Sequence, residues 1–230
     1  MKKLLTIGLL IALTFGAYAQ KQLGLKFGYN SSKVTTAYNN IDNETQKQSI
    51  EDLYDDYSSS LGGMNIGLAF NSGGELFSFQ LEVAYSQRGV RMLDADKNKS
   101  GYRRLNYIDT KPLFHVGYGT DTWKAYAQFG PSLNFWMSKK SYDKDDKFID
   151  ESDKWKTETD ESKNGSLDWR GELGIVLGAG FKYKVGPGWA LINPRYEWGI
   201  TPKTTHDMGS KGFAEVNRTF SINLGYLYEF

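Results

Sequence analysis

The stretch FSFQLEVAYS, residues 77–86, decides the fold. Its larger apolar side chains fall on every second position, and serine, glutamine, glutamate and alanine stand between them. Successive side chains of a β-strand point to opposite faces, whereas an α-helix repeats its apolar residues every three to four positions. The stretch therefore predicts a strand with one apolar face and one face that is polar or small.

The same alternation recurs along the whole chain and predicts eight strands. In residues 23–30, for example, leucine, phenylalanine and tyrosine alternate with glycine, lysine and asparagine. The eight runs lie at about residues 23–30, 63–70, 77–86, 108–116, 123–135, 169–183, 189–200 and 220–230.

In two of the runs it is harder to decide which side chains point outward. Pro112 interrupts the fourth run, where a shift of one residue exchanges the two faces. We place Ile108 and Phe114 outward there, which turns Asp109, Lys111 and His115 inward. In the seventh run, Trp189, Leu191 or their neighbours are placed in the apolar band, and from Ile192 onward Tyr196 and Trp198 face outward.

The connections between the runs alternate in length. Turn-forming residues fill the short links at 71–74, 119–122 and 184–188, whereas the links at about 31–60, 89–102, 138–167 and 201–214 are long and polar. Short periplasmic turns and long outer loops are typical of outer-membrane barrels. We therefore predict an all-β fold, an eight-stranded antiparallel transmembrane up-and-down β-barrel over residues 20–230.

The polar face carries the charges, and this decides which face meets lipid. A soluble barrel would have an apolar inside and a polar outside, but here the charges share their face with the glycines, and a narrow interior favours small residues between a few long ones. We predict an interior charge network that also includes Lys26 and Glu229, with Arg170 and Arg195 as hubs. Its members are Glu82, Asp109, Lys111, Lys124, Arg170, Glu172, Lys182, Arg195 and Glu197.

The first nineteen residues predict export. Lys2 and Lys3 precede an apolar run at 4–15, which leads to the small-residue pattern of Ala17 and Ala19. This arrangement is typical of a signal peptide cleaved before Gln20, and the run is too short for a transmembrane helix. Because the chain has no cysteine, we expect neither a lipid anchor at the cleavage site nor a disulfide.

Charge and motifs narrow the function. Without residues 1–19 the chain has 26 basic and 27 acidic residues, which argues against a nucleic-acid partner. Neither His115 nor His206 lies in a recognisable nucleophile motif, so we predict no enzymatic activity. The acidic segment 143–151 lacks the spacing of a helix-loop-helix calcium motif. The segment 51–57 is more acidic and has tyrosines that could bind a ligand, but acidic runs are usually solvated, so we predict no metal site and no cofactor.

Several segments, in order along the chain, resemble the PorT-type outer-membrane β-barrel family. They are GLKFGYN (24–30), EVAYSQRG (82–89), YIDTKPL (107–113), GPSL (130–133), GIVLGAG (174–180), RYEWGI (195–200) and LGYLYEF (224–230). The resemblance implies the barrel architecture but no catalytic residues. One member of that family takes part in a protein-secretion and gliding apparatus. The long charged segment 138–165 departs from the family's pattern and leaves room for a specific binding role.

Two classes of function remain open. The first is a non-enzymatic surface binding, adhesion or envelope-assembly protein of the outer membrane with a side-chain-filled lumen, of which a secretion-apparatus subunit is a sharper version. The second is a small passive channel. The expected partners are outer-membrane lipid, an extracellular or envelope protein ligand, and the barrel-assembly machinery, which would read the alternating aromatic residues Tyr226, Tyr228 and Phe230 as an assembly signal.

Overall fold

The computed structural model describes residues 20–39, 58–94, 96–150, 171–201, 204–208 and 211–230. The predicted signal peptide, residues 1–19, lies outside these described residues. The described residues contain no helix with the length and hydropathy needed to cross a membrane. Eight long strands and two short ones make up the described fold: β1 Gln20–Asn39, β2 Ser58–Gly73, β3 Phe77–Leu93, β4 Lys99–Gly119, β5 Trp123–Asp143, β6 Phe148–Asp150, β7 Gly171–Val185, β8 Gly188–Gly199, β9 Thr204–Met208 and β10 Lys211–Glu229.

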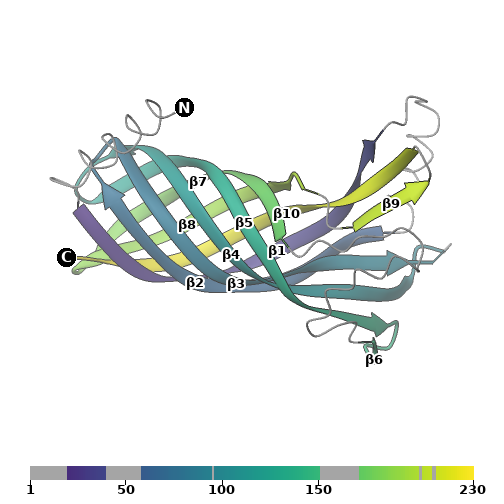
Figure 1. Ribbon diagram of the computed structural model, residues 1–230. Coiled ribbons are helices and arrows are strands. Elements are labelled where there is room, and N and C mark those ends of the chain that lie inside the picture. The colour runs from purple at the N-terminus through teal and green to yellow at the C-terminus, as the bar shows by residue number, and fades with distance from the viewer. Residues whose placement is uncertain (1–19, 40–57, 95, 151–170, 202–203, 209–210) are drawn as a thin grey trace.

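The eight long strands close into a barrel. Each pairs antiparallel with the next long strand in the chain, and the last strand, β10, pairs with β1 from Gln22 opposite Glu229 to Asn39 opposite Gly212. Figure 1 shows this ring of tilted strands. The short strands β6 and β9 lie outside the ring, where β6 pairs with β5 and β9 pairs with β10. The predicted eight-stranded antiparallel up-and-down barrel is confirmed.

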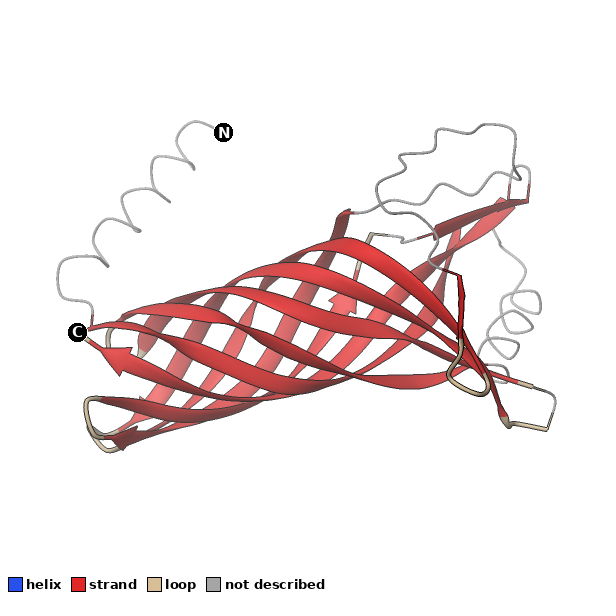
Figure 2. Cartoon of the chain, turned by 90° about the horizontal axis from the view of Figure 1, so that it is seen from below, coloured by secondary structure: helices blue, strands red, loops and turns tan. Residues whose placement is uncertain are grey.

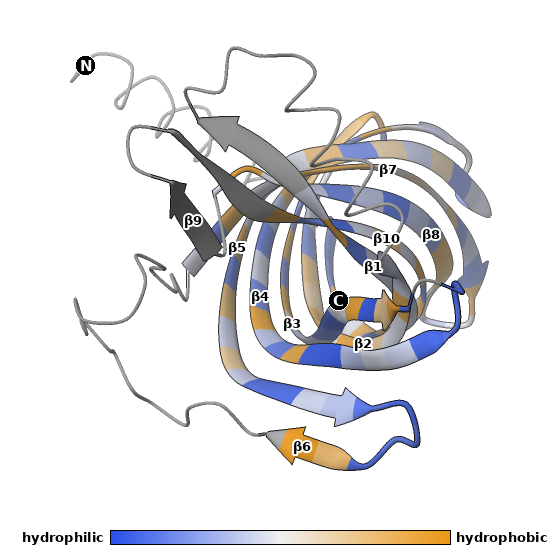
Figure 3. Cartoon of the chain, turned by 90° about the vertical axis from the view of Figure 1, so that its right-hand side faces the viewer, coloured by the Kyte–Doolittle hydropathy of each residue, from blue (hydrophilic) through white to orange (hydrophobic). Residues whose placement is uncertain are grey.

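The barrel is apolar outside and polar inside. Along β3, Leu81 and Val83 are 38% and 47% exposed, whereas Gln80 and Glu82 between them are buried. Figure 3 shows the same alternation of hydrophobic and hydrophilic residues along the other strands. In β4, the register chosen around Pro112 is confirmed, because the structure exposes Ile108 and Phe114 and buries Asp109, Lys111 and His115.

At the start of the seventh predicted run, where the sequence left two alternatives open, the structure places the neighbours of Trp189 and Leu191 outward. Trp189 and Leu191 are only 2% and 5% exposed and face the interior, while Ile192 is outward. The alternation of β8 runs without a break from Trp189 to Gly199, so no change of register separates Trp189 and Leu191 from the rest of the strand. The Trp189 ring lies beneath Lys184, and its Nε1 donates a hydrogen bond to Glu229 Oε2 at 2.5 Å, so a polar partner accounts for the inward position.

The short turns were predicted correctly, but the long connections were predicted too long. The strands continue past the apolar band: β3 ends at Leu93, β4 begins at Lys99, and β5 ends at Asp143. Backbone pairing persists there because neighbouring strands extend together, as β4 and β5 do as far as Gly101 opposite Asp143. Figure 2 shows the C-terminus at the end of the barrel with the tight turns and the extended strands at the opposite end, which we call the outer end.

Candidate functional site

The barrel interior holds a buried set of side chains with balanced charge. Besides Lys182, discussed below, each buried charged side chain of the described residues belongs to this set. We call it the interior charge network. It comprises four basic residues and four acidic ones: Lys26, Arg88, Lys111, Arg195, Glu82, Asp109, Glu172 and Glu197.

Arg88 is the hub of the network. Its Nη2 lies 2.7 Å from Asp109 Oδ2, and its Nη1 lies 2.9 Å from Glu197 Oε1 and 4.0 Å from Glu172 Oε1. The guanidinium carbon also lies 4.9 Å from the centre of the Tyr107 ring. A guanidinium has five donors in a fixed plane, and this geometry lets one side chain hold several carboxylates.

Glu197, on β8, is held by four side chains. Besides Arg88, its oxygens receive hydrogen bonds from Asn134 Nδ2 at 2.7 Å and Ser132 Oγ at 3.0 Å, and Lys111 Nζ lies 3.3 Å away. Lys111 also binds Asp109 at 2.6 Å. A buried carboxylate with so many donors is compensated for the water that it has lost.

Glu82 anchors a second cluster, nearer the end with the tight turns. Its Oε2 lies 2.6 Å from Arg195 Nη1, while its Oε1 pairs with Lys26 and accepts a hydrogen bond from Gln80 Nε2 at 2.6 Å. Gly178 gives Arg195 the room it needs: a Cβ at that position would lie 2.6 Å from Arg195 Cβ, too close for an unshifted side chain.

The two clusters bridge opposite walls of the barrel. Arg88 and Glu82 belong to β3, while Glu197 and Arg195 belong to β8. In the ring of eight strands, β3 and β8 are four places apart, which is diametrically opposite. An eight-stranded barrel is just wide enough for side chains to fill. The cross-wall ion pairs therefore occupy the lumen at two levels.

Most of the residues predicted for this network lie together in the lumen. The structure brings together Glu82, Asp109, Lys111, Glu172, Arg195 and Glu197. Lys182 is buried nearby, and the half-buried Lys124 lies over the Trp189 ring, 5.3 Å from its centre. Arg170 lies outside the described residues, so its predicted role as a hub is untested. Arg195 forms an ion pair with Glu82, and Arg88, which was not predicted, is the hub instead.

Arg88 could have been found from the sequence. It continues the inward row of β3 two residues beyond Ser86, but the glycine at 89 was taken as the start of a loop. Period-two counting carried one step further would have placed it inside.

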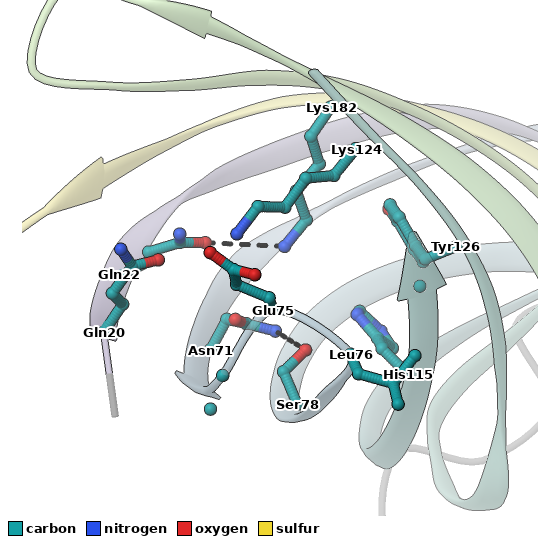
Figure 4. A pocket seen from close by; sticks show the side chains of 13 residues that line it. Gln20, Gln22, Asn71, Glu75, Leu76, Ser78, His115, Lys124, Tyr126 and Lys182 are labelled. Carbon is teal, nitrogen blue, oxygen red and sulfur yellow. Dashed lines mark hydrogen bonds between the residues drawn. The ribbon is translucent and has the colours of Figure 1, made fainter. Parts of the chain in front are cut away.

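A small cavity lies in the lumen at the end with the tight turns. Its volume is about 30 Å³, and Lys182, His115 and Tyr126 line it (Figure 4). His115 stacks on Tyr126 with 4.6 Å between ring centres, and Lys182 Nζ donates to Gln22 Oε1 at 3.4 Å. A volume of this size suits one or two water molecules. It is too small to form a continuous passage.

The other candidate residues have simpler roles. Tyr226 and Tyr228 face outward on β10, Phe230 is exposed directly after this strand, and the Tyr226 hydroxyl donates to the Val185 carbonyl at 2.8 Å. His206 lies in β9, and the acidic segment 51–57 lies outside the described residues.

The acidic tip between β5 and β6 satisfies its own carboxylates. Asp143 Oδ1 accepts hydrogen bonds from the backbone nitrogens of Asp145 and Lys147, and Asp146 pairs with Lys99. Nowhere in the described ranges do three or more histidine or acidic side chains gather as a metal site would require.

Comparison with known proteins places the chain among outer-membrane barrels. The family model of the outer membrane protein beta-barrel domain matches residues 18–204. No curated protein matches the chain.

Solved structures give several matches at low identity. One is the outer membrane protein OprG from Pseudomonas aeruginosa, at 14% identity over 94% of this chain and 99% of that one, with a TM-score of 0.49. Neisserial surface protein A matches at 14% identity over 90% and 97%, with a TM-score of 0.47. The attachment invasion locus protein of Yersinia pestis, in complex with a heparin analogue, matches at 12% identity over 92% and 99%, with a TM-score of 0.41.

Proposed function

Because the chain belongs to the outer membrane protein beta-barrel domain family, we propose that it is a non-conducting outer-membrane barrel that acts through its outer end. In this proposal the lumen is a rigid, filled support, and the outer connections bind an extracellular or envelope protein. The role is surface binding, adhesion or envelope assembly, and it involves no catalysis and no cofactor.

The ion pairs across the lumen are the observation that carries the proposal. A solute that crosses the barrel would have to separate Arg88 from Glu197 and Arg195 from Glu82, because each pair joins opposite walls. Separating a buried ion pair leaves uncompensated charge, which costs about 3–5 kcal/mol. Two such barriers in series make passive conduction unfavourable.

The shape of the outer end supports a binding role. Several strands continue well past the apolar band there, whereas tight turns close the other end. Binding residues are found most often on connecting segments that a rigid scaffold positions. The strand pairs that carry the outer connections supply such a scaffold.

Planar-bilayer recording tests the filled lumen. We expect no stable channel from the purified, folded barrel. Arg88→Ala combined with Glu197→Ala, which removes one cross-wall pair, is the matched variant, and it should conduct more than the wild type. Reproducible single-channel conductance of the folded wild type, lost on unfolding, would contradict the proposal and favour the passive channel.

Co-purification from native membranes tests the binding role. In the comparison variant a short Gly-Ser linker replaces the charged segment 144–165, which lies between β5 and β7 in the sequence. We expect a specific partner that the wild type retains and this variant loses. Recovery of components of one secretion machine would favour the sharper role as a secretion-apparatus subunit, and identical profiles would refute a binding role for this segment.

A further inference from the structure

The small cavity at the end with the tight turns has two lysines in its wall. Lys124 of β5 and Lys182 of β7 lie directly opposite each other in the sheet, and both line the cavity (Figure 4). Lys182 is 5% exposed and Lys124 is half-buried. Like charges directly opposite each other on one face of a sheet are destabilising. The two ammonium groups therefore favour an anion beside them.

Neither lysine forms an ion pair with a described residue. Lys124 Nζ lies 5.3 Å from the centre of the Trp189 ring, and Lys182 Nζ lies 5.3 Å from the centre of the Tyr126 ring. Lys182 also donates one long hydrogen bond, of 3.4 Å, to Gln22 Oε1. An ammonium group has three donors, so each lysine keeps at least two for a ligand.

The carboxylates nearest the chain termini leave this demand open. Glu229 is already paired with Lys184 at 2.8 Å. Glu75, in the turn between β2 and β3, lines the cavity but is exposed, and Figure 4 shows it pointing toward the two lysines. Because Gln20 and Leu76 beside it are exposed as well, the cavity reaches the surface at this end. A carboxylate can thus approach the lysines from this side.

His115 gives an independent indication of a ligand. Its side chain lines the cavity and is 3% exposed, and neither ring nitrogen has a hydrogen-bond partner among the described residues. The ring stacks on Tyr126 with 4.6 Å between ring centres, which fixes its plane. Buried polar groups in native proteins nearly always have a partner, and an imidazole has at least one N–H to donate.

The size of the cavity selects among anions. Its volume is about 30 Å³, and one water-sized position needs about 10–15 Å³. The cavity therefore has room for about two oxygen atoms, which suits a carboxylate better than the four oxygens of phosphate or sulfate. Further into the lumen, the ion pair of Glu82 with Arg195 closes the way.

We propose that this cavity binds a carboxylate group that enters from the end with the tight turns, the periplasmic side of an outer-membrane barrel. Lys124 and Lys182 donate to its oxygens, and the His115 ring adds a further donor. The carboxylate belongs either to a small free acid or to the end of a peptide chain. The proposal depends neither on the filled lumen nor on the partner of the outer connections.

NMR of the folded barrel in detergent, labelled with ¹⁵N only in histidine, tests this. The chain has two histidines, so His115 reports on the cavity and His206 of β9 is an internal control. Acetate is the probe and acetamide its uncharged counterpart, at constant pH with sodium sulfate as the background salt. We expect acetate to shift the His115 ring signals saturably and to leave those of His206 in place, whereas acetamide shifts neither.

Lys182→Gln should weaken acetate binding about tenfold or more, because a hydrogen bond to a charged group contributes about 1.5–3 kcal/mol and 1.4 kcal/mol is tenfold. The control, Lys184→Gln, removes the same charge two residues further along β7, outside the cavity wall, and should bind like the wild type. Glu75→Gln removes the chain's own carboxylate from the rim and should strengthen binding, by up to about fivefold.

Lys182→Gln removes one of two like charges, so we expect it to fold, as judged by heat-modifiable migration. If it does not, the exposed Glu75→Gln carries the test with the opposite sign. Tri-alanine that binds at least as tightly as acetate, and not after C-terminal amidation, would identify a chain end as the source, and binding of acetate alone a free acid. No saturable shift of His115, equal shifts with acetamide, or an equal loss in Lys184→Gln would each overturn the proposal.

Discussion

Removing the guanidinium of Arg88 is the sharpest test of the interior. Arg88→Met keeps most of the side-chain length and leaves three carboxylates, those of Asp109, Glu172 and Glu197, without their shared cation. Breaking a buried ion pair from one side costs about 3–5 kcal/mol. Because Lys111 still binds two of the three, we expect the low end of that range, about 3 kcal/mol.

Urea unfolding of the barrel refolded in phospholipid vesicles measures this cost. Arg91→Met is the matched control, since it removes the same group three residues further along β3 at an exposed position, where most substitutions change stability by less than about 0.5 kcal/mol. In the double variant Arg88→Met with Glu197→Gln, we expect the loss in the free energy of unfolding to differ from the sum of the two single losses by about 1–3 kcal/mol. The hub assignment is refuted if Arg88→Met costs no more than the control, or if that difference is zero.

Two further predictions concern facing and assembly. Leu81→Arg puts a charge on the lipid face and should destabilise the barrel by about 2–4 kcal/mol, whereas Gln80→Arg, one residue earlier and beside the Glu82 carboxylate, should cost less in the same urea assay. Equal losses at the two positions would mean that the facing is wrong. Deleting Phe230, whose backbone nitrogen donates to the Lys21 carbonyl at 3.0 Å, should reduce outer-membrane insertion in cells more than it reduces the stability of refolded barrel, because we expect the assembly machinery to read this residue. Matching losses in cells and in refolding would leave only a packing role.

Period-two alternation was enough to predict the barrel because each membrane-crossing strand meets two different solvents. Along β3, Leu81 and Val83 face lipid while Gln80 and Glu82 face the polar lumen. The residue types therefore predict which way each side chain points. Beyond the apolar band this contrast ends. The outward residues there, such as Arg91 and Asn106, are polar while Val90 and Leu105 are buried, so the apolar-outward alternation stops although the backbone pairing continues.

The network hub was missed for the same reason. Arg88 is followed by Gly89, and a glycine beside a charged residue is a common loop signal. The facing of Trp189 stayed open for a different reason, because large aromatic side chains at a strand end are also common in the lipid interface. Its indole nitrogen has a partner inside, Glu229, which comes from the distant end of the chain, so local sequence could not reveal it.

The interior charges also determine which face of each strand meets lipid. Buried ion pairs often add little net stability compared with apolar side chains of the same size, so stability alone gives no strong reason for the interior charge network. A slip of one residue in register would turn every side chain of a strand to the opposite face. For β3 that slip would turn Glu82 towards lipid and Arg88 towards the edge of the apolar band, and charged side chains on the lipid face destabilise a barrel by an amount that depends on depth. An apolar lumen would impose no such penalty, because both faces of the strand would then be alike. The charges thus disfavour the slipped pairings, and the cross-wall pairs between β3 and β8 extend that selection from neighbouring strands to the closure of the whole barrel.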